Sequence, residues 1–362
     1  MASVADEMAA DAEQRRRLSE RTVEALAGAG MFTICLPAAY GGPGASPVEM
    51  VDAVIELARG DGAAGWCAGI ASTTASMAAL LAPDVAHMVY PSAATATGGV
   101  FAPNATGVTV DRGFRVSGRW QWGSGTQHCA WIVGGARCDD GTQRVCFFPA
   151  EDVVFHDTWH SVGLRGTGSL DMSVDAAIVP VELTVPAVGG VAQVVEPIAR
   201  FPAFTLLALG IAATGLGVAR RALDEMTAIA AAKTPQFSSR TLANSAYAQL
   251  EAAKAEARWA SARAYLRDEL ATAWERAEHG DPIGVASRVA IRLAAANAAA
   301  AGAEVADVAF TVTGGTAVYE TSVLGRCVRD AHVVTQHIMV APKLGETLGR
   351  FLLGADFDAT MI

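Results

Sequence analysis

The chain has 362 residues, of which 52% are hydrophobic and 18% charged, so it can bury a large core and is not expected to be disordered. Its 37 acidic side chains outnumber its 27 basic ones, which argues against binding to nucleic acid or to an anionic membrane surface. We predict no membrane span and no signal peptide, and we expect a cytoplasmic protein. The six cysteines form no CxxC pair, so no metal site is expected.

The first region, residues 1–95, has the periodicity of helices. Segments 15–26 and 48–59 each place charged residues on one face and apolar residues on another, which predicts two amphipathic helices. Residues 61–81 are apolar and rich in alanine nearly all round, so we expect a buried helix there. The region is therefore predicted to be an N-terminal helical domain.

From residue 96 the pattern changes to short runs that favour β-structure, separated by turns of Gly, Asp and Asn. The clearest runs are 108–110, 114–116, 131–133 and 144–148. Runs of this length and composition are typical of a small antiparallel sheet or barrel. We place this middle β-domain at residues 96–185.

Residues 186–362 are predicted to be helical again. Long alanine-rich stretches cover 206–231, 239–280, 283–311 and 331–353, with few glycines or prolines inside them. Helices of this length and composition can pack closely, as in a four-helix bundle, and the same small side chains suit an interface between subunits. The expected class is α+β, mostly α: a helical domain, a β-domain and a C-terminal bundle.

The stretch 117–128 holds the first residues suited to chemistry. Gly123 and Gly125 flank Ser124, so a ligand can approach the backbone there, and the Ser124 hydroxyl offers one donor and two acceptors. Trp120 and Trp122 can stack on a planar ring. The same residues are also compatible with a plain β-hairpin whose aromatic side chains pair across the strands.

A second stretch, 157–171, surrounds polar side chains with glycines. Such a loop can present backbone N–H groups, hydroxyls and one cation to a phosphate or a ring. It lacks the strand–loop–helix context of a dinucleotide fingerprint, so a Rossmann fold is rejected. Its residues of interest are Gly163, Leu164, Arg165, Gly166, Thr167 and Ser169.

Taken together, these stretches resemble the acyl-CoA dehydrogenase superfamily. The matching residues are Gly118-Arg119-Trp120, Ser124-Gly125, Trp159 with 163–169, Tyr40-Gly41-Gly42, Gly314-Gly315 and Arg329-Asp330. The resemblance covers nearly the whole chain and implies an N-terminal helical domain, a middle antiparallel β-domain and a C-terminal four-helix bundle. It also implies a homotetramer that binds FAD or FMN between the β-domain and the bundle.

One position separates the activities within that superfamily. Most of its dehydrogenases carry a glutamate nine residues after the Arg of the Arg-Asp pair, and that position here is Ile338. Gln336-His337 beside it, and the stretch around Ser124, resemble the two-component flavin monooxygenases instead. That resemblance implies reduced flavin from a separate reductase and a C4a-hydroperoxide formed with O2, with Ser124 at flavin N5 and His337 as acid/base near C4a.

The remaining site residues are assigned from the resemblance, from their residue type and from their place in the sequence. Trp122, the six residues of the 163–169 loop, Gly314 and Gly315 would contact the flavin, and Trp120 and His128 would face a small-molecule substrate. From the residues alone, a histidine such as His337 is usually a core residue, Trp120 and Trp122 are more often core aromatics, and Arg165 can be a salt-bridge partner.

Two other functions stay open at this point. An acyl-CoA dehydrogenase, or its catalytically weak partner subunit, would need a displaced carboxylate, and neither Glu320 nor Glu346 fits the expected spacing. A flavin-free binding scaffold would keep the fold without the cofactor. The sequence does not identify the substrate or distinguish FMN from FAD.

Overall fold

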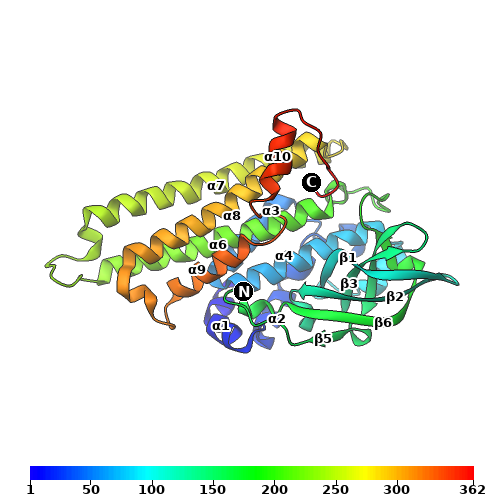
Figure 1. The fold of residues 1–362 in the computed structure, drawn as a ribbon, viewed down its shortest axis with the longest axis horizontal. Helices are drawn as coiled ribbons and strands as arrows, with labels where there is room; N and C mark the ends of the chain where they lie inside the picture. Colours follow the sequence, from blue (N-terminus) through cyan, green and yellow to red (C-terminus); the bar gives the residue numbers. More distant parts are fainter.

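A computed structural model describes residues 1–362 and shows helices, then one sheet, then helices again (Figure 1). The five N-terminal helices are α1 (Ala2–Arg15), α2 (Glu20–Gly28), α3 (Pro47–Gly60), α4 (Gly62–Ser76) and α5 (Pro83–Val89). A capping box between Ser46 and Glu49, with Pro47 in the first turn, fixes the start of α3. Asp61 caps α4 by accepting from the Ala63 N–H.

Helix α4 is buried along its whole length, as its composition predicts. It lies between the sheet and the bundle, and the two largest hydrophobic cores meet on it: one extends to the sheet, the other to the bundle. Gly69 of α4 faces Gly210 of the bundle, where an added Cβ would lie 3.0 Å from the Gly210 Cα. The absence of side chains at this crossing lets the two helices approach closely.

The sheet has seven strands in the order β5-β6-β2-β1-β3-β4-β7. The strands are β1 (Thr97–Val110), β2 (Gly113–Gly123), β3 (Trp131–Cys138), β4 (Gln143–Pro149), β5 (Val154–His156), β6 (Leu170–Pro180) and β7 (Thr184–Pro186). Five of the six pairings are antiparallel, whereas β1 and β3 run parallel. The sheet is thus mixed rather than purely antiparallel, because β2 returns the chain to the start of β1 and the turn after Gly123 feeds β3 onto the other edge of β1.

The C-terminal helices are α6 (Ala203–Ala232), α7 (Ala246–Glu278), α8 (Val285–Thr313), α9 (Val323–Val334) and α10 (Leu344–Leu352). The first three overlap the predicted stretches, although α7 begins at Ala246 rather than at residue 239. The single helix expected over 331–353 is wrong, because the chain leaves the helix after Val334 and starts another at Leu344. Pro342 has no N–H for a helical bond, and the Thr335 hydroxyl donates to the His332 carbonyl at the break.

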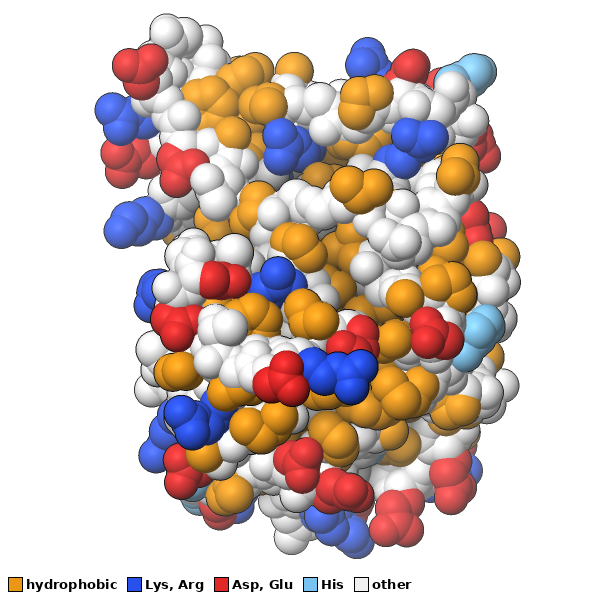
Figure 2. All heavy atoms as spheres, turned by 90° about the vertical axis from the view of Figure 1, so that its right-hand side faces the viewer, with side chains coloured by type: hydrophobic (Ala, Val, Ile, Leu, Met, Phe, Trp, Pro, Cys, Tyr) orange, Lys and Arg blue, Asp and Glu red, His pale blue; other side chains and the backbone are white.

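Helices α6 and α8 are long and apolar enough to cross a membrane, but most of the apolar window in each is buried inside the protein. They are the central helices of the bundle. Figure 2 shows the end of the molecule that carries the sheet, where charges of both signs are scattered among hydrophobic side chains.

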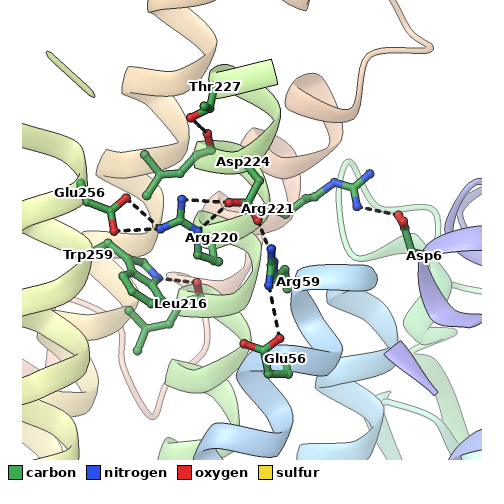
Figure 3. A network of polar contacts seen from close by, with 11 residues as sticks. Asp6, Glu56, Arg59, Leu216, Arg220, Arg221, Asp224, Thr227, Glu256 and Trp259 are labelled. Atoms are coloured by element: carbon green, nitrogen blue, oxygen red, sulfur yellow. Dashed lines mark hydrogen bonds and ion pairs between the residues drawn. The ribbon is translucent and has the colours of Figure 1, made fainter. Parts of the chain in front are cut away.

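An ionic network joins the N-terminal helices to the bundle (Figure 3). Arg220 of α6 binds Asp224 and, across the bundle, Glu256 of α7. Arg59 of α3 shares Asp224, and Arg221 of α6 binds Asp6 of α1. Four helices from two predicted domains are therefore held in one register on this side of the molecule.

Candidate active site

Ser124 follows β2 in the turn that leads to β3, and its side chain is buried. Gly125 adopts a left-handed conformation (φ 69°), which turns the chain here. The indole N–H of Trp66, from α4, donates to the Ser124 Oγ at 3.0 Å. The Ser124 and Ser169 hydroxyls lie 2.7 Å apart. The hydroxyl is thus held from two sides by residues far apart in the sequence.

His337 lies in the turn after α9, and its imidazole meets the same indole. The ring centroids of Trp66 and His337 are 5.5 Å apart, with the rings edge to face. The Nδ1 of His337 accepts from the Met339 N–H at 3.2 Å, which leaves Nε2 as the protonated nitrogen of the neutral ring. Burial, with a smaller contribution from the charge of Arg292, lowers the pKa of His337 to about 4. The imidazole is therefore neutral at physiological pH.

Arg292 of α8 fixes the backbone around His337. Its guanidinium is fully buried and donates to the Met339 carbonyl at 3.0 Å and to the Met361 carbonyl at 2.6 Å. Arg288, one turn earlier, donates to the Ile362 carbonyl at 2.9 Å. The turn that carries His337 and the C-terminal segment are thus attached to the same helix.

His128 lies four residues after Ser124, in the same turn. Its ring packs against Phe32 with centroids 5.2 Å apart, and burial lowers its pKa to about 4. Its Cε1 lies 3.4 Å from the position a Cβ on Gly125 would take. A second neutral imidazole, backed by an aromatic ring, therefore stands beside the Ser124 turn.

The 163–169 loop packs into the protein interior. The Leu164 N–H donates to Asp330 of α9 at 2.6 Å, and a Cβ on Gly163 would lie 2.4 Å from the Arg329 carbonyl oxygen. A Cβ on Gly166 would lie 2.9 Å from that of Ala63. The glycines of this loop are thus required for close contact with α4 and α9.

The polar side chains of that loop also face protein. Thr167 and Ser169 are buried and bind each other at 2.6 Å. Arg165 is half-buried, and its Nε is buried without a hydrogen-bond partner.

The two tryptophans of β2 have different surroundings. Trp120 is 1% exposed, packs against Phe148 and donates to the Gly135 carbonyl at 2.9 Å, so it is a core residue of the sheet and does not reach the Ser124 turn as a substrate contact. Trp122 has a positive φ of 68° and its side chain is 66% exposed. Such an exposed indole two residues before Ser124 is free to lie against a ligand.

Gly314 and Gly315 lie at the C-terminal end of α8, at the end of the bundle away from the sheet (Figure 1). Lys233, at the end of α6, donates to the Thr313 carbonyl there. Within one chain these glycines do not join the group around Ser124.

The sequence analysis missed Trp66 and Arg292, which connect the site. Trp66 lies in an apolar helix, and the sequence pattern predicts that an aromatic residue there belongs to the core. A stronger signal was available for Arg292: it stands on an alanine-rich helix with only three other charged residues, Arg288, Glu304 and Asp307.

The surroundings of Ser124 and His337 fit a planar, heteroaromatic cofactor. The polar groups are the buried Ser124 hydroxyl and the half-buried, neutral His337 imidazole, and the exposed Trp122 and Ile338 (68% exposed) provide apolar surface next to them. No carboxylate hydrogen-bonds to Ser124, Trp66 or His337, so the group lacks a carboxylate base for removing a proton from carbon. A flavin ring, with its N–H and C=O edge and apolar face, matches these residues.

Comparison with known proteins agrees with the geometry. Residues 1–83 match the model of the acyl-CoA dehydrogenase N-terminal domain, and residues 209–342 match that of the C-terminal domain. The chain is 33% identical to an indole-3-acetate monooxygenase of Pseudomonas putida, over 94% of this chain and 89% of the relative. It is 28% identical to a flavin-dependent monooxygenase oxygenase subunit, HsaA, of Rhodococcus jostii, over 93% and 92%.

A solved structure, the 3-HSA hydroxylase of Rhodococcus sp. RHA1, superposes with a TM-score of 0.93 at 26% identity, covering 100% of this chain and 96% of that one. The similarity therefore extends over all three regions, including the sheet that neither domain model matches.

Proposed function

Because the chain belongs to the flavin-dependent monooxygenases of the acyl-CoA dehydrogenase superfamily, we propose that it is the oxygenase component of a two-component system acting on a small aromatic compound. The proposal rests on the Ser124–Trp66–His337 group. In this group one indole hydrogen-bonds to the buried Ser124 hydroxyl and packs against the neutral His337 imidazole. Bound reduced flavin, FAD or FMN, supplies the electrons that activate O2; one oxygen atom enters the substrate and the other leaves as water.

Each residue of the group has a role suited to its surroundings. Ser124 binds the N5 edge of the ring. The neutral His337 holds a proton at Nε2 on the C4a side, because its Nδ1 accepts from the Met339 N–H. Trp122 covers one face of the ring, and the buried setting of Ser124 excludes water.

The 163–169 loop supports the cofactor's site from behind. Of its residues, Leu164 and Gly163 fix the loop on α9, and Arg165 retains a guanidinium that can meet an anionic group. Gly166, Thr167 and Ser169 contact protein, so they shape the site through their neighbours.

The substrate side is assigned to His128 and Phe32. Two aromatic rings in contact beside the Ser124 turn suit a flat, apolar compound. The 33% identical relative is an indole-3-acetate monooxygenase, so indole derivatives are the first compounds to test. Trp120 takes no part, because protein covers its side chain.

The system needs two further partners. One is a flavin reductase, since the oxygenase-subunit relatives imply a separate component and this chain has no dinucleotide fingerprint. The other is further copies of the chain, as a homotetramer in the cytoplasm. Exposed Phe237, Val318 and Tyr319 at the bundle end that carries Gly314 and Gly315 support such an interface, which would let the glycines reach a neighbouring copy's flavin.

The proposal is tested by supplying the purified protein with reduced flavin, 18O2 and a panel of indoles and phenols. We expect one labelled oxygen atom in the product, and none when the reduced flavin or O2 is omitted. Reduction of the bound flavin by an acyl-CoA, with no oxygen incorporated into any aromatic compound, would replace this function with the dehydrogenase alternative. A flavin-free protein that cannot be reconstituted would leave only the binding scaffold.

A further inference from the structure

Four polar side chains form an unbranched row behind the Ser124 turn. The Trp66 Nε1 lies 3.0 Å from the Ser124 Oγ, which lies 2.7 Å from the Ser169 Oγ. The Ser169 Oγ lies 2.6 Å from the Thr167 Oγ1, which lies 2.8 Å from the Leu164 carbonyl oxygen. All three hydroxyls are buried.

The two ends of the row fix the direction of every proton in it. An indole N–H can only donate, and a carbonyl oxygen can only accept. The Thr167 proton must therefore point to the Leu164 carbonyl. Ser169 then has to donate to Thr167, and Ser124 has to donate to Ser169.

One lone pair remains free after this assignment. The Ser124 oxygen uses one lone pair to accept from Trp66 and gives its proton to Ser169. Its second lone pair has no protein partner. We propose that Thr167 and Ser169 are positioning residues that hold the Ser124 hydroxyl as an acceptor, so that the site selects the reduced form of the flavin over the oxidised form.

The selection follows from the chemistry of N5 and depends on the proposed function, in which Ser124 meets that atom. In reduced flavin N5 carries a hydrogen and donates to the free lone pair. In oxidised flavin N5 only accepts, and the Ser124 proton is already committed to Ser169. A mismatched pair of acceptors leaves both without a partner, which is costly in a buried site.

Removing the Thr167 hydroxyl, at the far end of the row, reverses the direction of hydrogen-bond donation between Ser169 and Ser124. In Thr167→Val the Leu164 carbonyl keeps two donors, the Trp159 indole and the backbone N–H of residue 167, so no polar atom is orphaned there. Ser169 has then lost its acceptor and turns its proton to Ser124. That proton fills the second lone pair of Ser124 and frees the Ser124 hydroxyl to donate.

The first measurement compares dissociation constants for reduced and oxidised flavin, taken anaerobically and aerobically. We expect Thr167→Val to lower the preference for reduced flavin about tenfold, since a buried mismatch is exchanged for a match. Ser169→Ala leaves Ser124 free to donate or accept, so its loss of preference is smaller. Thr214→Val removes a buried hydroxyl that donates within α6 and serves as the matched control, with no change of the ratio.

The second measurement needs no cofactor. Selectively labelled tryptophan gives an indole N–H resonance for Trp66, assigned by its absence in Trp66→Phe. An oxygen that passes its own proton on is a stronger acceptor, so the resonance is expected to move upfield in Thr167→Val and Ser169→Ala but not in Thr214→Val.

The two measurements separate the possible failures. An unmoved Trp66 resonance, or equal weakening of both flavin forms in Thr167→Val, would overturn the directed row and leave Thr167 with a purely structural role. If the wild-type protein binds neither flavin form, the proposed function fails while the resonance still reports on the row. A moved resonance with an unchanged affinity ratio would contradict the selection itself.

Discussion

The indole of Trp66 contacts both polar residues of the candidate active site: its Nε1 donates to the Ser124 Oγ at 3.0 Å, and its ring meets the His337 imidazole at 5.5 Å between centroids. Ser124 comes from the end of β2 and His337 from the turn after α9, whereas Trp66 lies in the buried helix α4. The helix between the sheet and the bundle therefore sets the separation of the two groups.

The first prediction concerns that indole. Trp66→Phe keeps an aromatic ring beside His337 but removes the N–H that holds Ser124. We expect the H2O2 released per flavin oxidised to rise about fivefold, because loss of one buried hydrogen bond costs about 1 kcal/mol. Trp259→Phe, which loses an indole bond to the Leu216 carbonyl in the bundle, should leave that yield unchanged. Equal yields in the two variants would mean that Trp66 has no specific link to Ser124.

The second prediction concerns Arg292. In Arg292→Met the positive charge is lost and the Met339 carbonyl is released, so the pKa of His337 should rise. Arg288→Met loses only its bond to the C-terminal segment and should leave that pKa unchanged. Histidine NMR titration, with His337 assigned by its absence in His337→Asn, measures both. A shift of the same size in the two variants would assign the effect to the C-terminal segment rather than to Arg292.

Acid stability gives a third prediction. The pKa of His337 falls from an ordinary 6.5 to about 4 on folding, so the unfolded chain binds more protons between these values. The stabilisation of the folded state by the neutral His337 is complete above pH 6.5 and is lost as the pH falls to about 4. Thermal denaturation of His337→Asn should therefore depend less on pH in this window than the wild type. His332→Asn, which removes an exposed histidine, should follow the wild type.

Asp330 gives stability the opposite dependence on pH. Burial raises its pKa from 3.8 to about 7, although the Leu164 N–H opposes the shift. The folded chain then binds the Asp330 proton more tightly than the unfolded chain does. The contribution of Asp330 to the free energy of unfolding is therefore complete below pH 3.8 and is lost as the pH rises through about 7. Asp330→Asn should remove that dependence, because an amide oxygen can still accept from Leu164. Thermal denaturation at pH 5 and pH 8 checks it, with exposed Asp175→Asn as control; an unchanged pH dependence would show that Asp330 is ionised throughout.

The three regions of the chain could be predicted because each depends on local periodicity. The break between α9 and α10 was missed although Pro342 is a local signal for it, and its second determinant, Arg292, comes from another helix. The parallel pairing of β1 with β3 also depends on the path of the chain through the Ser124 turn, which strand composition does not encode.

The candidate site was predicted unevenly for the same reason. Ser124 and His337 were found through a resemblance in their motifs, and the structure brings them to one indole. Trp120 was assigned to the substrate by its type alone, and its burial depends on which face of β2 meets the core. Thr167 and Ser169 were predicted to contact the ligand because they lie in a glycine-rich loop, whereas their hydroxyls bind each other.

The most direct test of the account needs no knowledge of the substrate. Protein loaded with reduced flavin is mixed with O2, and the rate of H2O2 release is compared for the wild type and Ser124→Ala. If Ser124 binds N5, the wild type should release H2O2 slowly and the variant at least about tenfold faster. Equal rates in the two proteins, matching that of free reduced flavin, would contradict the central claim that Ser124 and its neighbours form an oxygen-activating flavin site.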